Sequence, residues 1–285
     1  MLVNKDKDKV TRAGLPHDSM TARRRVDEHI EAERTNDVAN IMSTMSAWDQ
    51  HYSFLSATPE GPLRLFLAEN TAEVHEHYVD RVRSWSLAAG HGLKKIQSPW
   101  YTFHEAVGEF RTFPSGEVVK HRLVFLFPTW TDGIIGEISW EPQWSEEVPS
   151  DWRQEADVAR CLDELDATWA SGDVDTRLAL VEDDCCSVIR TVELGGNRRL
   201  RTVARNKAEL RAAWSVAAAG QVVSMERTNR VIAHFYAFEA YRMLIDLPHG
   251  RVEREVARLY PVGQSGRFIG ELSYSFDVPL SGATS

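Results

Sequence analysis

The sequence predicts two tandem α+β domains, each a curved antiparallel sheet wrapped around helices in the shape of a cone. The first observation behind this prediction is an internal repeat, because IGEISW at 135–140 returns as IGELSY at 269–274. The second is that three other landmarks recur in the same order, at offsets of 133 to 136 residues. The third is that helical segments precede a run of strand-like segments in each copy. A collinear repeat of about 120 residues indicates a duplicated domain.

The repeat divides the chain. The three further landmarks are Asn36-Asp37-Val38 with Gly172-Asp173-Val174, 70–74 with 206–210, and Phe127-Pro128 with Tyr260-Pro261. We expect a flexible tail over 1–21, a first domain over 22–144, a linker over 145–151, a second domain over 152–277 and a tail over 278–285. Function should lie in what differs between the copies.

The elements of the first copy follow in order. Capping and breaking residues predict a helix over 22–35, a turn at Asn36-Asp37 and a second short helix ending near Trp48. A strand over 51–57 and a turn over 59–62 lead to a longer helix over 71–87. Three strands over 99–112, 117–127 and 133–141 complete the copy, with a turn at 114–116 between the first two. The second copy repeats this plan, with 247–250 as the equivalent turn.

Composition excludes several classes of protein. With 43% hydrophobic and 26% charged residues the chain is typical of soluble globular proteins, and its net charge of -9 offers no basic surface for nucleic acid. The N-terminal segment lacks the apolar stretch of a signal peptide, and no window reaches the length of a membrane span. We therefore expect a cytoplasmic protein without nucleic-acid or membrane partners. Its three cysteines have no spacing suited to zinc or to a disulfide framework.

The repeated landmarks resemble those of the nuclear transport factor 2-like superfamily, which includes SnoaL-like polyketide cyclases, ketosteroid isomerase and scytalone dehydratase. The resemblance rests on the Asn-Asp-Val turn, on the segment 70–74 that enters a helix, and on the strand pair around Phe127 and 135–140. It covers both copies. It implies that the two cones pack through their sheets as a pseudo-dimer, and homo-oligomers of such pseudo-dimers are compatible with it. The superfamily holds enzymes, binding modules and non-catalytic subunits, so the fold alone assigns no reaction.

The catalytic positions of ketosteroid isomerase can be matched to positions in this chain. There a tyrosine on the first helix and a protonated aspartate on a late strand form the oxyanion hole, and another aspartate is the base. The matching positions in this chain are His29, Leu123 and a position near Thr58. Both carboxylates are missing, so the sequence does not predict a steroid isomerase.

The same matching gives the residues that point into the cone. They are Tyr52, Phe54 and Ser56 on the first strand, then Trp100, Thr102, His104 and Ala106, then His121, Leu123, Phe125 and Phe127, and finally Glu137, Ser139 and Glu141. Convergent titratable groups on an aromatic wall are typical of a small-molecule site. The predicted catalytic residues are His29, Tyr52, His104, His121 and Glu137, and the predicted substrate-binding residues are Trp48, Trp100, Phe125 and Ser139.

The second copy lacks these histidines. Counting by the repeat, the positions of His29, Tyr52, His104 and His121 carry Leu165, Val188, Phe238 and Glu255, while Glu271 and Ser273 are kept. The first domain is therefore predicted to be catalytic and the second to be degenerate or structural. Glu137 has its twin in Glu271, so a structural hydrogen bond is an equal alternative for it.

The histidines also fit purely structural roles. His29 and Glu33 would suit a solvent-facing helix pair, and the inward strand histidines would suit a hydrogen-bonded core. His75 and His77 cannot share a helix face, so both are expected at the surface. Two inward histidines and a glutamate could bind a metal in principle, but no local ligand spacing supports this, and we expect neither metal nor cofactor.

The resemblance then implies the chemistry. We expect a cofactor-independent lyase or dehydratase that acts on a small hydrophobic, aromatic alcohol or carbonyl compound and releases water or formaldehyde. His121 or His104 would be the base, His29 and Tyr52 would donate hydrogen bonds to the oxyanion, and Glu137 would orient a histidine. An isomerase or polyketide-type cyclase is the nearest alternative. A non-catalytic ligand-binding or assembly domain is the alternative from another class.

Overall fold

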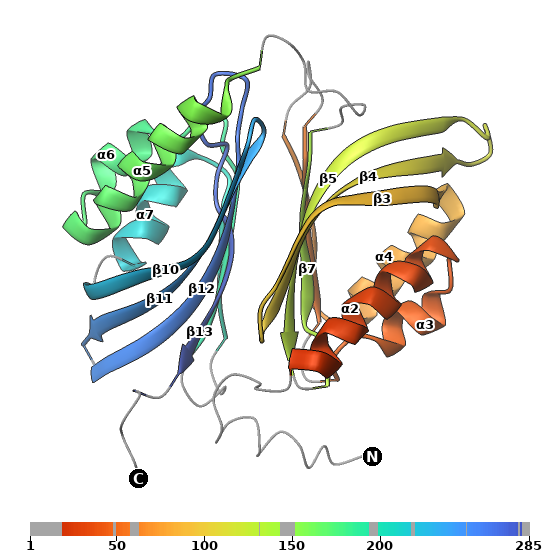
Figure 1. The fold of residues 1–285 in the computed structure, drawn as a ribbon, viewed down its shortest axis with the longest axis horizontal. Helices are drawn as coiled ribbons and strands as arrows, with labels where there is room; N and C mark the ends of the chain where they lie inside the picture. The colour runs from red at the N-terminus through yellow and green to blue at the C-terminus, as the bar shows by residue number, and fades with distance from the viewer. Residues whose placement is uncertain are drawn as a thin grey trace. The chain divides into compact units, whose positions relative to one another are not determined.

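A computed structural model describes residues 19–47, 50–57, 63–130, 132–142, 152–193, 199–217, 220–248, 250–278 and 280. The described residues fall into two compact units, one up to residue 142 and one from residue 152. Each unit is an α+β domain in which three helices lie against one face of a curved sheet (Figure 1). The α+β fold class predicted from the sequence is confirmed for each unit.

The first unit contains three helices and seven strands. The helices are α2 (Ser19–Arg34), α3 (Val38–Ser43) and α4 (Thr71–Ser84). The strands are β1 (His51–Ser56), β2 (Arg64–Ala68), β3 (Trp85–Gln97), β4 (Tyr101–Thr112), β5 (Val118–Trp130), β6 (Gly133–Ile134) and β7 (Gly136–Glu141). The sheet order is β2-β1-β7-β5-β4-β3, and β6 pairs with β5.

The second unit repeats this order. Its helices are α5 (Glu155–Ser171), α6 (Val174–Ala179) and α7 (Lys207–Ala217), and its strands are β8 (Ser187–Val192), β9 (Arg199–Ala204), β10 (Gln221–Ala233), β11 (Tyr236–Leu247), β12 (Gly250–Pro261) and β13 (Leu272–Val278). The sheet order β10-β11-β12-β13-β8-β9 is the order of the first sheet read from the other edge.

Both sheets are mixed, which corrects the expectation of antiparallel sheets. β1 pairs with β7 in parallel, and β8 pairs with β13 in parallel. Each of these pairs joins the strand that comes first in the sequence of its domain to the strand that comes last. A long connection that contains a helix permits parallel pairing, whereas a short turn does not. The remaining ladders are antiparallel, as predicted.

The repeated sequence landmarks are helix caps and close backbone contacts. The Asp37 carboxylate accepts a hydrogen bond from the Asn40 amide at 3.0 Å to begin α3. Asn70 and Glu73 cap α4 reciprocally, because Asn70 accepts from the Glu73 amide and Glu73 accepts from the Glu69 amide. The second unit repeats both devices, with Asp173 before α6 and Asn206 with Glu209 before α7.

The glycine of the repeated IGE segment is required by close packing. A Cβ atom on Gly136 would come within 2.1 Å of the His51 ring. A Cβ atom on Gly270 would come within 2.0 Å of the Cys186 carbonyl oxygen. Any larger residue would push apart the parallel strand pair inside each sheet, so both copies keep glycine.

Two strands and two helix ends differ from the sequence prediction, and one of these ends is that of α3, which lies at Ser43 rather than near Trp48. β2 and β3 were not predicted, and α4 ends at Ser84 rather than near Leu87 because β3 begins at Trp85. β3 is one of the two edge strands of its sheet, and it contributes one wall of the site described below. None of the helices in the described ranges is long and apolar enough to cross a membrane.

Candidate acid/base site in the first domain

The first domain encloses a cavity of about 470 Å³ between its helices and the concave face of its sheet. This volume lies within the range of sites for small organic ligands. Much of the wall is apolar or aromatic, with Phe54, Trp85, Phe110, Phe125 and Phe127 among the lining residues. Charged and titratable groups also line the cavity: Glu33, Glu137, Glu141, Arg34, Arg81, His77, His91, His104 and His121.

Small residues on β3 and β4 leave room for this cavity. Gly90 pairs with Gly108, and Gly92 pairs with Ala106, and all four line the cavity. The ladders of the second domain place large side chains at the same positions. Met225 pairs with Met243 and Arg227 pairs with Tyr241.

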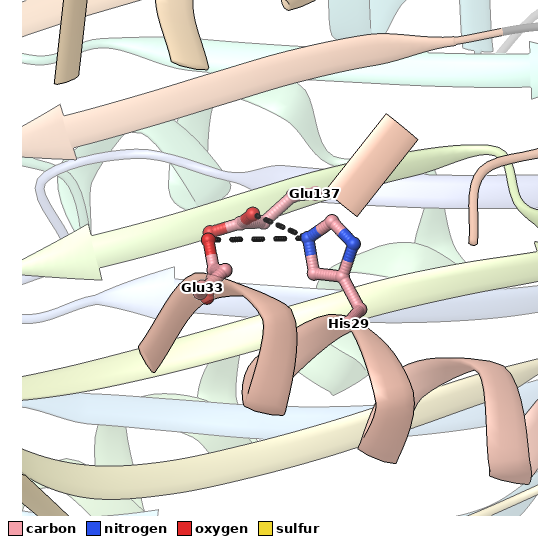
Figure 2. A group of neighbouring side chains, drawn as sticks. All are labelled: His29, Glu33 and Glu137. Atoms are coloured by element: carbon pink, nitrogen blue, oxygen red, sulfur yellow. Dashed lines mark ion pairs between the residues drawn. The ribbon is translucent and has the colours of Figure 1, made fainter. Parts of the chain in front are cut away.

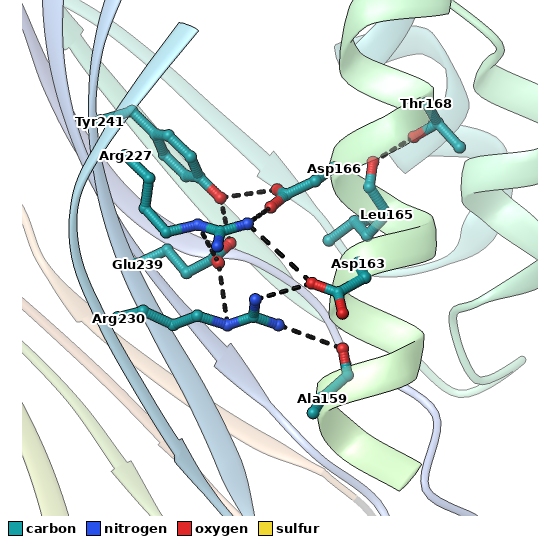
Figure 3. Close-up of polar contacts among 9 residues, drawn as sticks. All are labelled: Ala159, Asp163, Leu165, Asp166, Thr168, Arg227, Arg230, Glu239 and Tyr241. Carbon is teal, nitrogen blue, oxygen red and sulfur yellow. Dashed lines mark hydrogen bonds and ion pairs between the residues drawn. The ribbon is translucent and has the colours of Figure 1, made fainter. Parts of the chain in front are cut away.

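The concave side of the second domain is filled with large and charged groups. The guanidinium groups of Arg177 and Arg258 lie 3.6 and 4.0 Å from the centre of the Trp169 ring. Nearby, the Tyr241 hydroxyl contacts both Asp166 and Glu239, which also pair with Arg227 (Figure 3). This packing gives the second domain an interior unlike that of the first.

A chain of buried polar groups lies behind the cavity. His29 Nδ1 lies 2.7 Å from Thr44 Oγ1, and His29 Nε2 lies 3.0 Å from the Tyr78 hydroxyl. The Tyr78 hydroxyl in turn lies 3.0 Å from Glu137 Oε2. His29 and Tyr78 are fully buried, and Glu137 is 2% exposed. The solvent-facing alternative for His29 is therefore wrong, because α2 turns this face toward the core.

Hydrogen-bond counting leaves two arrangements for the protons of these buried groups. Thr44 donates its only hydroxyl proton to the Ile41 carbonyl at 2.6 Å, so it accepts from His29, and Nδ1 carries a proton. Tyr78 has one hydroxyl proton for two neighbours, His29 Nε2 and Glu137. Either His29 is an imidazolium that donates to Tyr78 while Glu137 is ionised, or His29 is neutral and Glu137 is a carboxylic acid. One proton is thus shared between His29 and Glu137 through Tyr78.

Burial sets the electrostatics of Glu137. Desolvation and the nearby Glu33 carboxylate raise the pKa of Glu137 above its usual value, which favours the acid form. Glu33 is itself paired with the Arg81 guanidinium in a close buried contact, and Arg81 lies 4.3 Å over the Trp85 ring. Figure 2 shows His29 and Glu33 projecting from one helix toward Glu137 on the sheet.

The same three side chains are the group that a metal ion could use. The ligand atoms of His29, Glu33 and Glu137 lie within 4.8 Å of one another. The facing atoms already have protein partners, because Arg81 pairs with Glu33 and Tyr78 bonds both His29 and Glu137. These partners fit a proton-transfer network better than a metal centre.

His104 and His121 lie on the strand side of the cavity. Burial and the neighbouring Lys95 ammonium lower the pKa of His104, so its imidazole is neutral at pH 7. Its Nδ1 is buried without a hydrogen-bond partner among the described residues. His121 Nδ1 makes a close ion-pair contact with Glu141 Oε1, and both residues line the cavity.

His77 lines the cavity, which corrects the expectation that it lies at the surface. Its ring packs between Tyr52 and Phe66, with centroids 4.3 and 4.5 Å away. Burial, together with Arg81, lowers the pKa of His77 to about 4, so it is neutral at physiological pH. His75 is exposed, as expected.

Several solved structures are similar to part of the chain. No protein-family model and no curated protein matches the chain. The three solved structures described below each cover less than half of it. The chain is similar to nuclear transport factor 2-like proteins, the resemblance that its sequence predicts.

Three of these structures illustrate the likeness. An epoxide hydrolase/cyclase-like enzyme of pyran ring formation in the polyether salinomycin is 13% identical, covers 43% of this chain and 92% of its own, and has a TM-score of 0.35. A ketosteroid isomerase-like protein from Erwinia carotovora atroseptica is 13% identical over 43% of this chain and 95% of its own, with a TM-score of 0.30. A nuclear transport factor 2-like protein from Burkholderia xenovorans is 16% identical over 45% and 90%, with a TM-score of 0.32.

The predicted site residues fall into three groups in the first domain. Tyr52, His104, His121, Phe125 and Glu137 line the cavity. His29 lies behind Glu137, and Trp100 and Ser139 are buried but are not among the lining residues. Trp48 lies outside the described residues.

Sequence reasoning missed Glu33, Tyr78 and Arg81 as parts of the site. Glu33 and Arg81 line the cavity, and Tyr78 joins His29 to Glu137. The repeat contained a signal for Tyr78, because it aligns with Trp214, whose Nε1 donates to Glu271 at 3.0 Å. Both copies thus place a hydrogen-bond donor from the third helix on the repeated glutamate.

The strand ladders also correct the alignment between the copies. Thr102 pairs with Phe127, and Ala237 pairs with Tyr260. Counting from these pairs, Glu239 rather than Phe238 matches His104, and Arg254 rather than Glu255 matches His121. The offset between the two copies differs by two residues between these adjacent strands. A single offset of 134 therefore assigned the wrong counterparts to His104 and His121.

Proposed function

We propose that the first domain is a cofactor-independent lyase or dehydratase that uses acid/base chemistry on a small, hydrophobic, oxygenated aromatic molecule. The observation that carries this proposal is the Glu137 carboxyl at the wall of a largely apolar cavity, connected through Tyr78 to a buried histidine. A carboxyl whose pKa is raised by burial is suited to proton transfer near neutral pH.

Glu137 is the group we assign to the proton transfer itself. It lines the cavity, whereas His29 reaches the cavity only through Tyr78. When the shared proton moves through Tyr78 to His29, Glu137 is left ionised and can take a proton from a carbon beside a substrate carbonyl. In the reverse direction the same chain supplies a proton to a departing hydroxyl group. This role replaces the sequence-based expectation that Glu137 orients a histidine.

Tyr52 is suited to stabilise the oxyanion that forms. It pairs directly with Glu137 across the β1–β7 ladder and lines the cavity. Burial and the Glu137 carboxylate raise the pKa of Tyr52 well above its usual value, so its hydroxyl keeps its proton and remains a donor. A donor at this place stabilises negative charge on a substrate oxygen as that charge develops.

The test is a paired substitution in the two copies. Aryl β-hydroxy ketones and diaryl compounds with a hydroxymethyl group are incubated with the protein, with and without chelator, and the products are analysed for loss of water or formaldehyde. Glu137→Gln should reduce turnover by about 100-fold or more, the usual scale for removing a general acid or base. The matched change Glu271→Gln should leave turnover unchanged.

Three outcomes would contradict the proposal. Activity lost on chelation would point to metal chemistry, and a product with the mass of the substrate would point to an isomerase. Equal effects of Glu137→Gln and Glu271→Gln, in variants whose circular dichroism shows the native fold, would mean that the repeated glutamate is structural in both copies.

A further inference from the structure

A second carboxylate lies at the other end of the same cavity. Glu141 follows Glu137 by four residues on β7, and both line the cavity. Residues four apart on a strand share a face and are separated by about 13 Å. The cavity therefore has two polar ends, one at Glu137 and one at Glu141.

The Glu141 end is arranged for hydrogen bonding rather than for proton relay. His121 Nδ1 contacts Glu141 Oε1, so the imidazole orients this carboxylate, and both residues line the cavity. His121 also lies beside Phe110, with ring centroids 5.7 Å apart. Because Glu141 is only 7% exposed and lines the cavity, a ligand that reaches it meets a carboxylate acceptor.

His104 provides a further polar atom along the wall between the ends. It pairs with Phe125 on the neighbouring strand, and its Nδ1 is buried without a hydrogen-bond partner among the described residues. A buried polar atom without a partner is costly unless a ligand or water satisfies it. A side chain on Gly92 would come within 2.7 Å of His104 Nε2, so glycine at that position preserves the orientation of the ring.

The part of the cavity in register with Glu141 and His121 suits a flat ring system. Gly90, Gly92, Ala106 and Gly108 form a floor with almost no side chains. Aromatic rings line other parts of the wall, including the Trp85–Phe110 pair with centroids 4.8 Å apart. Flat aromatic molecules gain contact with both kinds of surface.

We propose that this cavity binds an elongated aromatic molecule with an oxygen function at each end. The reacting oxygen lies at Glu137, and a neutral hydroxyl group lies at Glu141 and His121. A hydroxyl can donate to the Glu141 carboxylate, whereas a ligand carboxylate would be repelled by it. This inference rests on the proposed function for the location of the reaction, and it adds the shape and the second functional group of the substrate.

Biphenyls without a leaving group test the inference by binding alone. Calorimetry measures the affinity of 4,4′-dihydroxybiphenyl, 4-hydroxybiphenyl and 4′-hydroxybiphenyl-4-carboxylate for the wild-type full chain. The dihydroxy compound should bind about tenfold more tightly than the monohydroxy compound, the scale of a hydrogen bond to a charged group. The carboxylate should bind more weakly than the dihydroxy compound.

Two variants and one control locate the effect. Glu141→Gln should remove most of the tenfold difference between the two hydroxylated compounds. Ala106→Tyr, which introduces the residue of the second domain, should weaken both by about tenfold or more by filling the floor. Asp277→Asn, which alters the carboxylate paired with Arg254 in the second domain, should change nothing.

The inference is overturned if the wild-type protein binds none of the three compounds, if the carboxylate binds as tightly as the dihydroxy compound, or if Glu141→Gln keeps the tenfold ratio. These results are separable from the proposed function, because no turnover is involved. Two-ended binding with no effect of Glu137→Gln on turnover would contradict only the proposed reaction.

Discussion

Removing the Tyr78 hydroxyl tests the proton connection between His29 and Glu137. Tyr78→Phe keeps the ring in the core, where the residue is fully buried, and deletes one oxygen. That oxygen makes two hydrogen bonds of 3.0 Å, so the variant leaves His29 Nε2 and Glu137 Oε2 without their shared partner. We expect a loss of about 2 kcal/mol in unfolding free energy, which is the cost of unsatisfied buried polar groups.

The effect on turnover should exceed what this loss of stability explains. His29 Nε2 and Glu137 Oε2 lie 3.8 Å apart, which is too far for direct proton transfer without movement. We expect turnover of the best substrate from the screen to fall by about 10- to 100-fold at a temperature where the variant is fully folded. The acid limb of the pH–rate profile should also move to higher pH, because Glu137 loses a hydrogen bond that favours its ionised form.

The second domain supplies the control. Trp214→Phe removes the equivalent donor to Glu271 and creates a small cavity, so it should cost about 2 to 4 kcal/mol without lowering turnover. Nitrogen-15 NMR of the histidine side chains adds a readout that needs no substrate, and it should show a proton on Nδ1 of His29. Unchanged turnover and pH profile in Tyr78→Phe, or an Nδ1 without a proton, would refute the relay.

Three further predictions concern other charged groups. His121→Ala should weaken substrate binding and leave most of the turnover number, because Glu137 is the group assigned to proton transfer, and its structural counterpart change Arg254→Ala should affect neither. Steady-state kinetics of both variants checks this, and a loss of about 100-fold in turnover for His121→Ala would make this histidine the base instead. Burial and a neighbouring carboxylate raise the pKa of Glu239 from 4.5 to about 7. Between these two pH values the folded state holds a proton that the unfolded state has released. The free energy of unfolding should therefore fall by up to about 3 kcal/mol as pH rises from 4.5 through 7. Denaturant titrations should lose this slope in Glu239→Gln, and a slope of the opposite sign would contradict the assignment. Arg81→Met should cost about 3 to 5 kcal/mol in thermal unfolding by leaving the Glu33 carboxylate buried and unpaired, and the double variant with Glu33→Gln should recover part of that loss.

Local signals in the sequence were enough to predict much of the fold. The Asp37 and Asn70 caps depend on side chains three residues from the amides they bond, so a short stretch of sequence determines them. The glycine of IGEISW was recognised only as a repeated residue. Its reason, the close approach of His51, depends on a strand more than 80 residues away and could not be read from the segment itself.

The elements that were missed depend on partners distant in the sequence. β3 contains the stretch 88–95, in which two glycines and two lysines hide any alternation, and it is a strand because β4 pairs with it. Because β3 was not predicted, the predicted cavity lacked the wall that this strand contributes. His77 was misplaced for the same reason, since helix periodicity indicates a face but not whether Tyr52 and Phe66 cover that face.

Small residues form the cavity floor on β3 and β4 of the first domain, and large residues take the equivalent positions on β10 and β11 of the second domain. This difference has an evolutionary consequence. A cavity like that of the first domain could not be recreated in the second domain by one mutation, because Met225, Arg227, Tyr241 and Met243 would all have to become small. Replacing only Tyr241 or only Arg227 with a small residue would leave its acidic partners buried without that contact. Stability would fall before any binding space appeared. On the proposed assignment of function to the first domain, single mutations there can change the ligand, whereas single mutations in the second domain affect only its stability.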